Sequence, residues 1–156
     1  MLALFQFTLF PSNILCNQME LDIMLHSQSS NLFFLLPKRF SEMESTLVEM
    51  LHEKNCEPDV WTMNSTLRAF GSSRQTETME KCYEKFQSAG VQPNIRTFNI
   101  LLDSYGKAGE YEKMSAVMEY MQKYHYSWTI VTYNVVIDAF GKAGDLKQME
   151  RSESVV

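Results

Sequence analysis

The chain has 156 residues, of which 45% are hydrophobic and 21% are charged, and its net charge is −5. This composition is typical of a globular protein, and no apolar run approaches the roughly 20 residues that a membrane-spanning helix needs. The acidic balance is the opposite of the basic excess that is usual in proteins gripping nucleic acid through phosphates. Recognition of a nucleic acid would therefore have to rest on stacking and hydrogen bonds to unstacked bases in a local groove.

The cysteines and histidines are scattered at unrelated spacings, namely at Cys16, His26, His52, Cys56, Cys82 and His125. An odd number of cysteines at such spacings gives neither a disulfide framework nor a CxxC metal pair. A reducing compartment fits this pattern best. We therefore expect no metal site and no cofactor.

Residues 1–37 form the first distinct segment of the chain, and they contain no lysine or arginine. The segment therefore lacks the charged start of a secretory signal and the arginine-rich character of an organelle transit peptide. It also does not join the repeat that follows. We expect residues 1–37 to be disordered or non-native, with the true upstream repeat replaced just before Lys38.

From about residue 40 onward the chain repeats itself with a period of 35 residues. The same or similar residue types recur at this offset: Asn64, Asn99 and Asn134; Phe70, Tyr105 and Phe140; Gly71, Gly106 and Gly141; Met79, Met114 and Met149. A fixed period of 20 to 50 residues is the signature of stacked repeat architectures. We therefore expect a tandem array.

The first half of each unit carries an apolar stripe with the i, i+3, i+4, i+7 spacing of an amphipathic helix. The stripe consists of Phe98, Leu101, Leu102 and Tyr105 in one unit and of Tyr133, Val136, Ile137 and Phe140 in the next. We predict a helix here, preceded by Thr62, Thr97 or Thr132, whose hydroxyl can accept a backbone N–H near the helix start. The helix should end at a Gly-Lys-Ala-Gly turn, residues 106–109 and 141–144, where glycine permits left-handed backbone.

A second helix follows in each unit and presents its own apolar face, formed in one unit by Tyr111, Met114, Val117, Met118 and Met121. A further second helix is predicted from about Phe40 to Lys54, without a visible partner. Each helix pair is too small to bury its own stripe, so it is stable only when stacked on its neighbours. The predicted fold is all-α, with a partial repeat at 38–59, full repeats at 60–94 and 95–129, and a truncated repeat at 130–156.

These units resemble the repeats of plant pentatricopeptide repeat proteins of the P type. The resemblance rests on the openings Thr97-Phe98-Asn99 and Thr132-Tyr133-Asn134, on the two Gly-Lys-Ala-Gly motifs, and on the closing Gly90-Val-Gln-Pro-Asn94. It implies a right-handed superhelical solenoid whose first helices line a groove for single-stranded RNA, about one base to a unit. It also implies work in a chloroplast or mitochondrion, in RNA processing, stability or translation.

The resemblance further implies which residues read a base, namely a polar residue early in the first helix and the residue that closes the unit. The early residues are Asn64, Asn99 and Asn134, and the closing residues are Asn94 and Thr129. An asparagine amide offers both a donor and an acceptor to a base edge. By resemblance, both complete pairs lean towards a pyrimidine. The alternative is that each asparagine only bonds the local backbone.

Two further sets of contacts follow from the resemblance. Trp61, Arg96 and Val131 hold the position that wedges a base, where an indole or guanidinium plane contributes on the order of 1 to 3 kcal/mol. Lys107 and Lys142 hold a position near the phosphate backbone. The alternative for the lysines is a solvated turn, and for Trp61 and Arg96 an ordinary surface position.

Two other classes of function are weighed against RNA binding. A protein-interaction scaffold, whose groove takes a partner helix or peptide, fits the acidic balance. It does not require an asparagine at the same place in every unit. An enzyme is not expected, because the sequence shows no nucleophile paired with a base and no carboxylate pair in a persuasive context. The Gly-Lys-Ala-Gly motif also lacks the longer glycine frame of a phosphate-binding loop.

Overall fold

The computed structural model describes residues 37–52 and 58–143, and this part of the chain forms helices without strands. The helices are α2 (Pro37–His52), α3 (Val60–Ser72), α4 (Thr76–Ser88), α5 (Ile95–Ala108), α6 (Tyr111–Lys123) and α7 (Ile130–Ala143). Within these ranges no helix is long and apolar enough to cross a membrane. The expectations for residues 1–36 and for the stretch from 144 to 156 lie outside the described residues.

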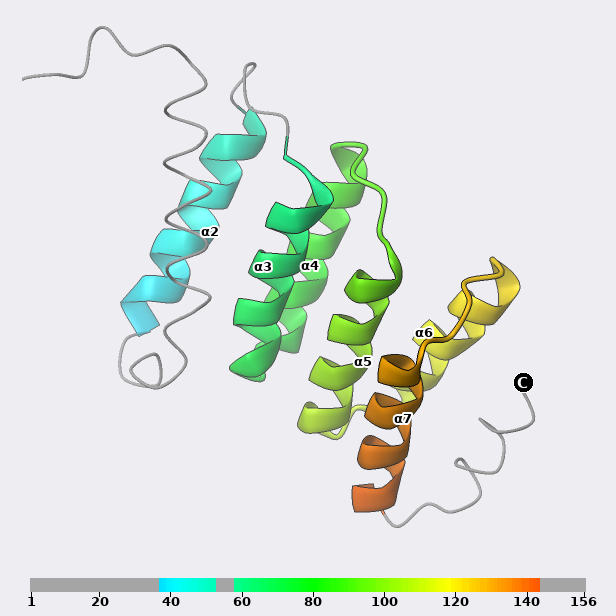
Figure 1. Ribbon diagram of the computed structural model, residues 1–156. Coiled ribbons are helices and arrows are strands. Elements are labelled where there is room, and N and C mark those ends of the chain that lie inside the picture. Colours follow the sequence, from blue (N-terminus) through cyan, green and yellow to red (C-terminus); the bar gives the residue numbers. More distant parts are fainter. Residues whose placement is uncertain (1–36, 53–57, 144–156) are drawn as a thin grey trace, which may run out of the picture.

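The helices form two layers. In Figure 1, α3, α5 and α7 stand side by side in one layer, with α4 and α6 behind them. Contacts join α3 to α5 and α5 to α7, and each hairpin is closed by contacts of α3 with α4 and of α5 with α6. The predicted all-α fold of stacked helix-turn-helix units is therefore confirmed for this part of the chain.

The predicted place of the threonines at the start of the first helix was wrong. The helices begin at Val60, Ile95 and Ile130, so each threonine lies inside the first turn. The residue that closes the preceding unit is the N-cap: the Asp59 carboxylate accepts the Thr62 backbone N–H at 2.8 Å, and the Asn94 amide oxygen accepts that of Thr97 at 3.0 Å. Asn94 and Thr97 form a reciprocal capping box, because the Thr97 hydroxyl also accepts the Asn94 backbone N–H. Because the two hydrogen bonds of this capping box satisfy backbone groups at Asn94 and Thr97, the helix begins before the threonine and not after it.

The Gly-Lys-Ala-Gly motif is mostly helical, which corrects its prediction as a turn. Gly106, Lys107 and Ala108 belong to the last turn of α5, and only Gly109 leaves the helix, with φ 79° and ψ 16°. This is the left-handed conformation that glycine adopts without steric cost, as predicted for the helix end. Because the motif continues the helix by three residues, Lys107 projects from α5 itself.

Gly71 and Gly106 allow successive first-layer helices to approach closely. A Cβ atom on Gly71 would overlap the Ser104 hydroxyl of α5 and lie 2.7 Å from the Ser104 Cβ. A Cβ atom on Gly106 would lie 2.7 Å from the Cβ of Ala139 on α7. Ser104 and Ala139 are themselves 35 residues apart, so the two contacts are one repeated interface.

The predicted apolar stripes form the core. Buried residues from both layers make it continuous, among them Met63, Leu67, Phe70, Met79, Phe86, Phe98, Leu102, Tyr105, Met114, Val136 and Phe140. The prediction fails at Ile137, whose side chain is 44% exposed although its counterpart Leu102 is fully buried. Leu102 lies on α5, against which α7 packs, whereas no described helix follows α7, which carries Ile137. Burial of this stripe position thus depends on the neighbouring unit.

A polar network joins the two complete units at their second helices. The Lys113 ammonium lies 2.7 Å from a Glu80 carboxylate oxygen and 2.8 Å from one of Glu110. The Thr76 hydroxyl donates to Glu110 at 2.6 Å, and the Tyr105 hydroxyl donates to Glu80 at 3.0 Å. The hydrogen bonds from Lys113 and then Thr76 lower the pKa of Glu110 from its usual 4.5. The ionised carboxylate therefore stabilises the junction.

We expect the protein to lose stability in acid through this network. Because the pKa of Glu110 is lower in the folded state, its contribution is complete above the ordinary pKa and is lost as the pH falls through the folded pKa, below 4.5. Glu110→Gln should therefore show a smaller fall in unfolding midpoint over this acid range than the unsubstituted chain, measured by circular dichroism. Glu119→Gln, which neutralises an exposed carboxylate on α6, is the control. An equal acid response in both variants would contradict this role for Glu110.

Candidate functional site

A groove of about 640 Å³ lies on the face formed by α3, α5 and α7. It is lined by Arg68, Ser72, Ile95, Arg96, Asn99, Ile100, Asp103, Ser104, Lys107, Thr129, Val131 and Val135. Residues from three successive units contribute, since the lining begins on α3 and ends on α7. Three positive side chains, Arg68, Arg96 and Lys107, and one carboxylate, Asp103, line it. The groove is therefore locally basic in a chain whose net charge is −5.

Half of the predicted site residues line this groove, namely Arg96, Asn99, Lys107, Thr129 and Val131. The other half, namely Trp61, Asn64, Asn94, Asn134 and Lys142, lie outside its lining. Among these, Trp61 is 43% exposed near the start of α3, and Lys142 is exposed on the last turn of α7. The structure thus brings together in one groove a complete predicted pair, Asn99 with Thr129, and two wedge positions, Arg96 and Val131.

The three equivalent asparagines differ in exposure although each is the fifth residue of its helix. Asn64 on α3 is only 6% exposed, Asn99 on α5 is half-buried, and Asn134 on α7 is exposed. Asn134 lies on α7, which no described helix follows, whereas α5 packs against α3 and α7 packs against α5. Asn64 Oδ1 is buried without a hydrogen-bond partner within the described part of the chain. Asn99 is the one of the three that lines the groove.

The closing residues are engaged at helix starts. Asn94 caps α5 through its side-chain oxygen, and the Thr129 hydroxyl accepts the backbone N–H of Thr132 at 3.3 Å. Thr132 in turn donates its hydroxyl proton to Asn99 Oδ1 at 2.8 Å. The closing residue of one unit is therefore linked to the asparagine of the same unit through the next helix.

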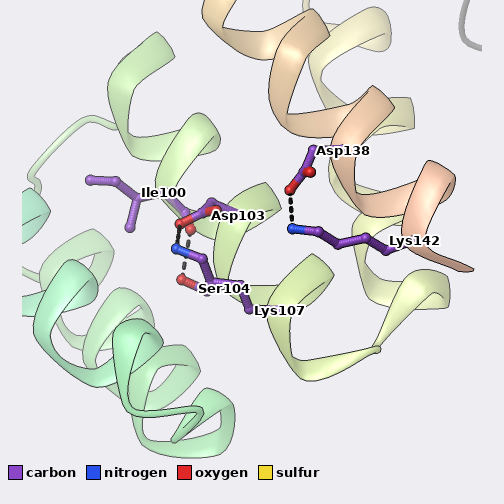
Figure 2. A network of polar contacts seen from close by, with 6 residues as sticks. All are labelled: Ile100, Asp103, Ser104, Lys107, Asp138 and Lys142. Carbon is purple, nitrogen blue, oxygen red and sulfur yellow. Dashed lines mark hydrogen bonds and ion pairs between the residues drawn. The ribbon is translucent and has the colours of Figure 1, made fainter.

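The two predicted lysines are held by ion pairs along their own helices. Figure 2 shows Lys107 directed at Asp103 on α5 and Lys142 directed at Asp138 on α7, each with an N–O distance of 2.6 Å. The pairing with Asp138 raises the pKa of Lys142. All four side chains are about half exposed or more, and exposed pairs of this i, i+4 kind stabilise a helix only weakly. Such a pair is weak enough for the lysine to leave it for a phosphate.

The sequence interpretation missed Arg68 and Asp103 as groove residues. Each lies four residues after an asparagine, Asn64 or Asn99, and therefore one helical turn along the same face. The same step from Asn134 reaches Asp138. The helical spacing of the asparagines was the signal that could have identified them.

The described residues offer little for chemistry of another kind. No group of three or more histidine, cysteine, aspartate or glutamate side chains within residues 37–52 and 58–143 could hold a metal ion. Cys82 is buried in the core, and this burial raises the pKa of its thiol to about 12. The thiol is therefore protonated at neutral pH and is a poor nucleophile.

Comparison with known proteins agrees with the arrangement of the helices. A family model described as a pentatricopeptide repeat domain matches residues 46–108 and 81–143. Over 53 residues the chain is 80% identical to the pentatricopeptide repeat-containing protein At5g48730, chloroplastic, of Arabidopsis thaliana, a match that covers 34% of this chain and 10% of that protein. Over 51 residues it is 50% identical to the pentatricopeptide repeat-containing protein At3g53170 of the same plant, covering 33% and 11%. The matches thus span about a tenth of the length of these relatives.

The fold also resembles a solved structure. The crystal structure of the pentatricopeptide repeat protein PPR10 in complex with an 18-nt psaJ RNA element superposes with a TM-score of 0.55 at 18% identity, covering 89% of this chain and 24% of that one. The similarity confirms the predicted right-handed superhelical solenoid of helix-turn-helix repeats. At this identity it concerns the fold alone.

Proposed function

Since this chain belongs to the pentatricopeptide repeat family, we propose that the groove on α3, α5 and α7 binds single-stranded RNA with a preference for its bases. The repeats of this family bind RNA, as in the complex of PPR10 with an 18-nt RNA element. The groove supports the same role here because its residues come from three successive units at equivalent positions. A strand of RNA lying across it would meet one unit after another.

The observation that carries the proposal is the composition of the groove wall. Asn99, an uncharged side chain able to bond a base edge, lines the same groove as two wedge positions, Arg96 and Val131. A guanidinium plane stacks on a base, and a branched apolar side chain packs against its face. The groove therefore combines a hydrogen-bonding group with surfaces suited to the two faces of one base.

The charges of the groove suit a phosphate backbone without requiring a basic protein. Arg68 and Arg96 contribute permanent positive charges, and Lys107 can leave its weak ion pair with Asp103 for a phosphate oxygen. For single strands, each phosphate neutralised makes the slope of log affinity against log salt concentration steeper by about 0.7. The acidic remainder of the chain limits nonspecific attraction of RNA, so contacts to bases contribute a larger share of the binding free energy.

The unit pairs are proposed to lean towards pyrimidines, Asn64 with Asn94 and Asn99 with Thr129. Asn64 is only 6% exposed and lies outside the groove lining, so we assign the stronger base contact to Asn99. We further propose that the protein acts on organellar RNA, in processing, stability or translation. The relative named as chloroplastic supports this compartment.

Binding to short oligonucleotides tests the proposal directly. We expect the full chain to bind labelled oligopyrimidine RNA more tightly than oligopurine RNA in fluorescence anisotropy, with an affinity that falls as salt rises. A duplex RNA of the same length is the control, because its bases are stacked and paired and cannot enter the groove. Indifference to all of these RNAs would contradict RNA binding and favour a scaffold whose groove takes a peptide.

A further inference from the structure

Thr132 lies behind the groove wall and links the two residues that are proposed to read a base. Its side chain is fully buried, so it meets no solvent and does not line the groove. Its hydroxyl accepts the backbone N–H of Thr129 at 3.1 Å and lies 3.1 Å from the Thr129 hydroxyl. It donates to Asn99 Oδ1 at 2.8 Å. Thr132 therefore contacts Thr129, which closes the unit, and Asn99, which opens it.

Counting protons fixes the direction of these bonds. A hydroxyl has one proton and two lone pairs. Since the proton of Thr132 goes to Asn99, the contact between the two hydroxyls requires that Thr129 donate and Thr132 accept. Both lone pairs of Thr132 are then occupied, one by the Thr129 hydroxyl and one by the Thr129 backbone N–H. The only group that Thr132 can still bond is an acceptor.

The bond from Thr132 also shows how the Asn99 amide is turned. Its oxygen faces Thr132 and accepts the hydroxyl proton, as an NH₂ group could not. The opposite end of the amide, Nδ2, is then left for the groove that Asn99 lines. The end of the amide that is left for the groove offers hydrogen-bond donors to a base.

The preceding unit is built differently, because its closing residue is an asparagine. The Thr97 hydroxyl donates to the side-chain oxygen of Asn94 at 3.2 Å, and that oxygen also accepts the Thr97 backbone N–H. The Thr97 proton is thereby used within the cap. Asn64 Oδ1 correspondingly has no hydrogen-bond partner among the described residues. We call the hydrogen bonds from Thr129 through Thr132 to Asn99 the relay. A closing residue whose side-chain oxygen only accepts takes the threonine proton and ends the relay. The Thr129 hydroxyl instead donates to Thr132, so the Thr132 proton is available for Asn99.

We propose that Thr132 is a positioning residue that holds the Asn99 amide with Nδ2 towards the groove, so that the unit 95–129 prefers cytosine over uracil. The preference rests on the proposed RNA-binding function. Cytosine carries an acceptor nitrogen, N3, at the centre of its pairing edge, and an NH₂ group can donate to it. Uracil carries an N3–H donor there, which would need the amide oxygen, and that oxygen is turned towards Thr132.

The test compares three variants of the full chain. Thr132→Val removes the hydroxyl, Thr132→Ser retains it, and Thr97→Val removes the equivalent hydroxyl in a unit where it does not reach the asparagine. Anisotropy gives the ratio of affinities for oligocytidine and oligouridine RNA at one salt concentration. We expect Thr132→Val to reduce this ratio by about fivefold, the equivalent of one net hydrogen bond. Thr132→Ser and Thr97→Val should leave it unchanged.

A measurement without RNA separates the relay from the binding function. In ¹⁵N NMR of the free protein, the side-chain NH₂ signals of Asn99 should shift in Thr132→Val and stay in place in Thr97→Val. Thr129→Asn keeps a helix cap but ends the relay, so it should shift the same signals even if Thr132→Val folds poorly. Unmoved Asn99 signals in both Thr132→Val and Thr129→Asn would overturn the relay. Failure of the unsubstituted chain to bind either RNA would instead overturn the proposed function, and with it the base preference.

Discussion

Alanine in place of Gly106 lowers the free energy of unfolding by about 1 to 2 kcal/mol, because its Cβ atom would lie 2.7 Å from the Cβ of Ala139. Ala139 has no rotamer by which to move away, so α5 and α7 must separate. Overpacking of this kind costs about 1 to 3 kcal/mol. The better helix propensity of alanine offsets at most about 1 kcal/mol of that loss. Gly71→Ala should behave similarly, since the Ser104 hydroxyl could turn aside only by leaving its bond to the Ile100 carbonyl.

Gly141 provides a matched control for these substitutions. It is the equivalent residue of α7, and a Cβ atom there would meet no described atom within 4 Å. Gly141→Ala should therefore raise the free energy of unfolding by up to about 1 kcal/mol through helix propensity alone. Urea unfolding followed by circular dichroism measures all three variants. Equal effects of Gly106→Ala and Gly141→Ala would show that close helix approach is not what glycine provides here.

Alanine in place of Arg96 should weaken the binding of oligopyrimidine RNA by about tenfold. Arg96 is exposed at the second position of α5 and lines the groove next to Asn99. The substitution removes a plane that can stack on a base, which contributes about 1 to 3 kcal/mol in other single-strand binders. It also removes one positive charge, so the salt dependence should decrease. Fluorescence anisotropy across a series of salt concentrations measures both effects.

Two further variants separate stacking from charge at this position. Arg96→Lys keeps the charge but loses the planar guanidinium, and it should recover only part of the affinity. Lys81→Ala removes a positive charge from the exposed face of α4, in the other helix layer. It should change affinity little. If Arg96→Lys bound as tightly as the unsubstituted chain, stacking by Arg96 would be excluded, and equal losses in Arg96→Ala and Lys81→Ala would indicate nonspecific attraction.

Helices and their stacking could be predicted from the sequence because both follow from a pattern along the chain. The stripe from Phe98 to Tyr105 is buried in α5 as expected, and the glycine that ends α5 is left-handed. The start of each helix could not be read from the threonines. Asn94 was recognised only as a closing residue and Asp59 was passed over, but the side chains of both cap the next helix. The choice between competing caps depends on geometry that residue types do not contain.

The site residues divide in the same way. The period of 35 residues places an asparagine at the fifth residue of each first-layer helix, and the structure agrees. What surrounds each asparagine differs, since Asn64 is covered, Asn99 lines the groove and Asn134 is exposed. A sequence position is the same in every unit, but its exposure differs from one unit to the next. The sequence therefore identified which positions are equivalent, but it did not show which of them are accessible to a ligand.

The sequence by itself determined the repeat, the helical hairpins and the family, because periodic apolar residues fix which faces must be buried wherever the units stack. Only the tertiary structure decided that Arg68 and Asp103 share a groove with Asn99, and that Thr132 turns its amide. These relations join residues of different units, which are far apart in sequence. Their hydrogen bonds and close contacts arise from the distance between packed helices, and that distance is set by the interface at Gly71 and Gly106.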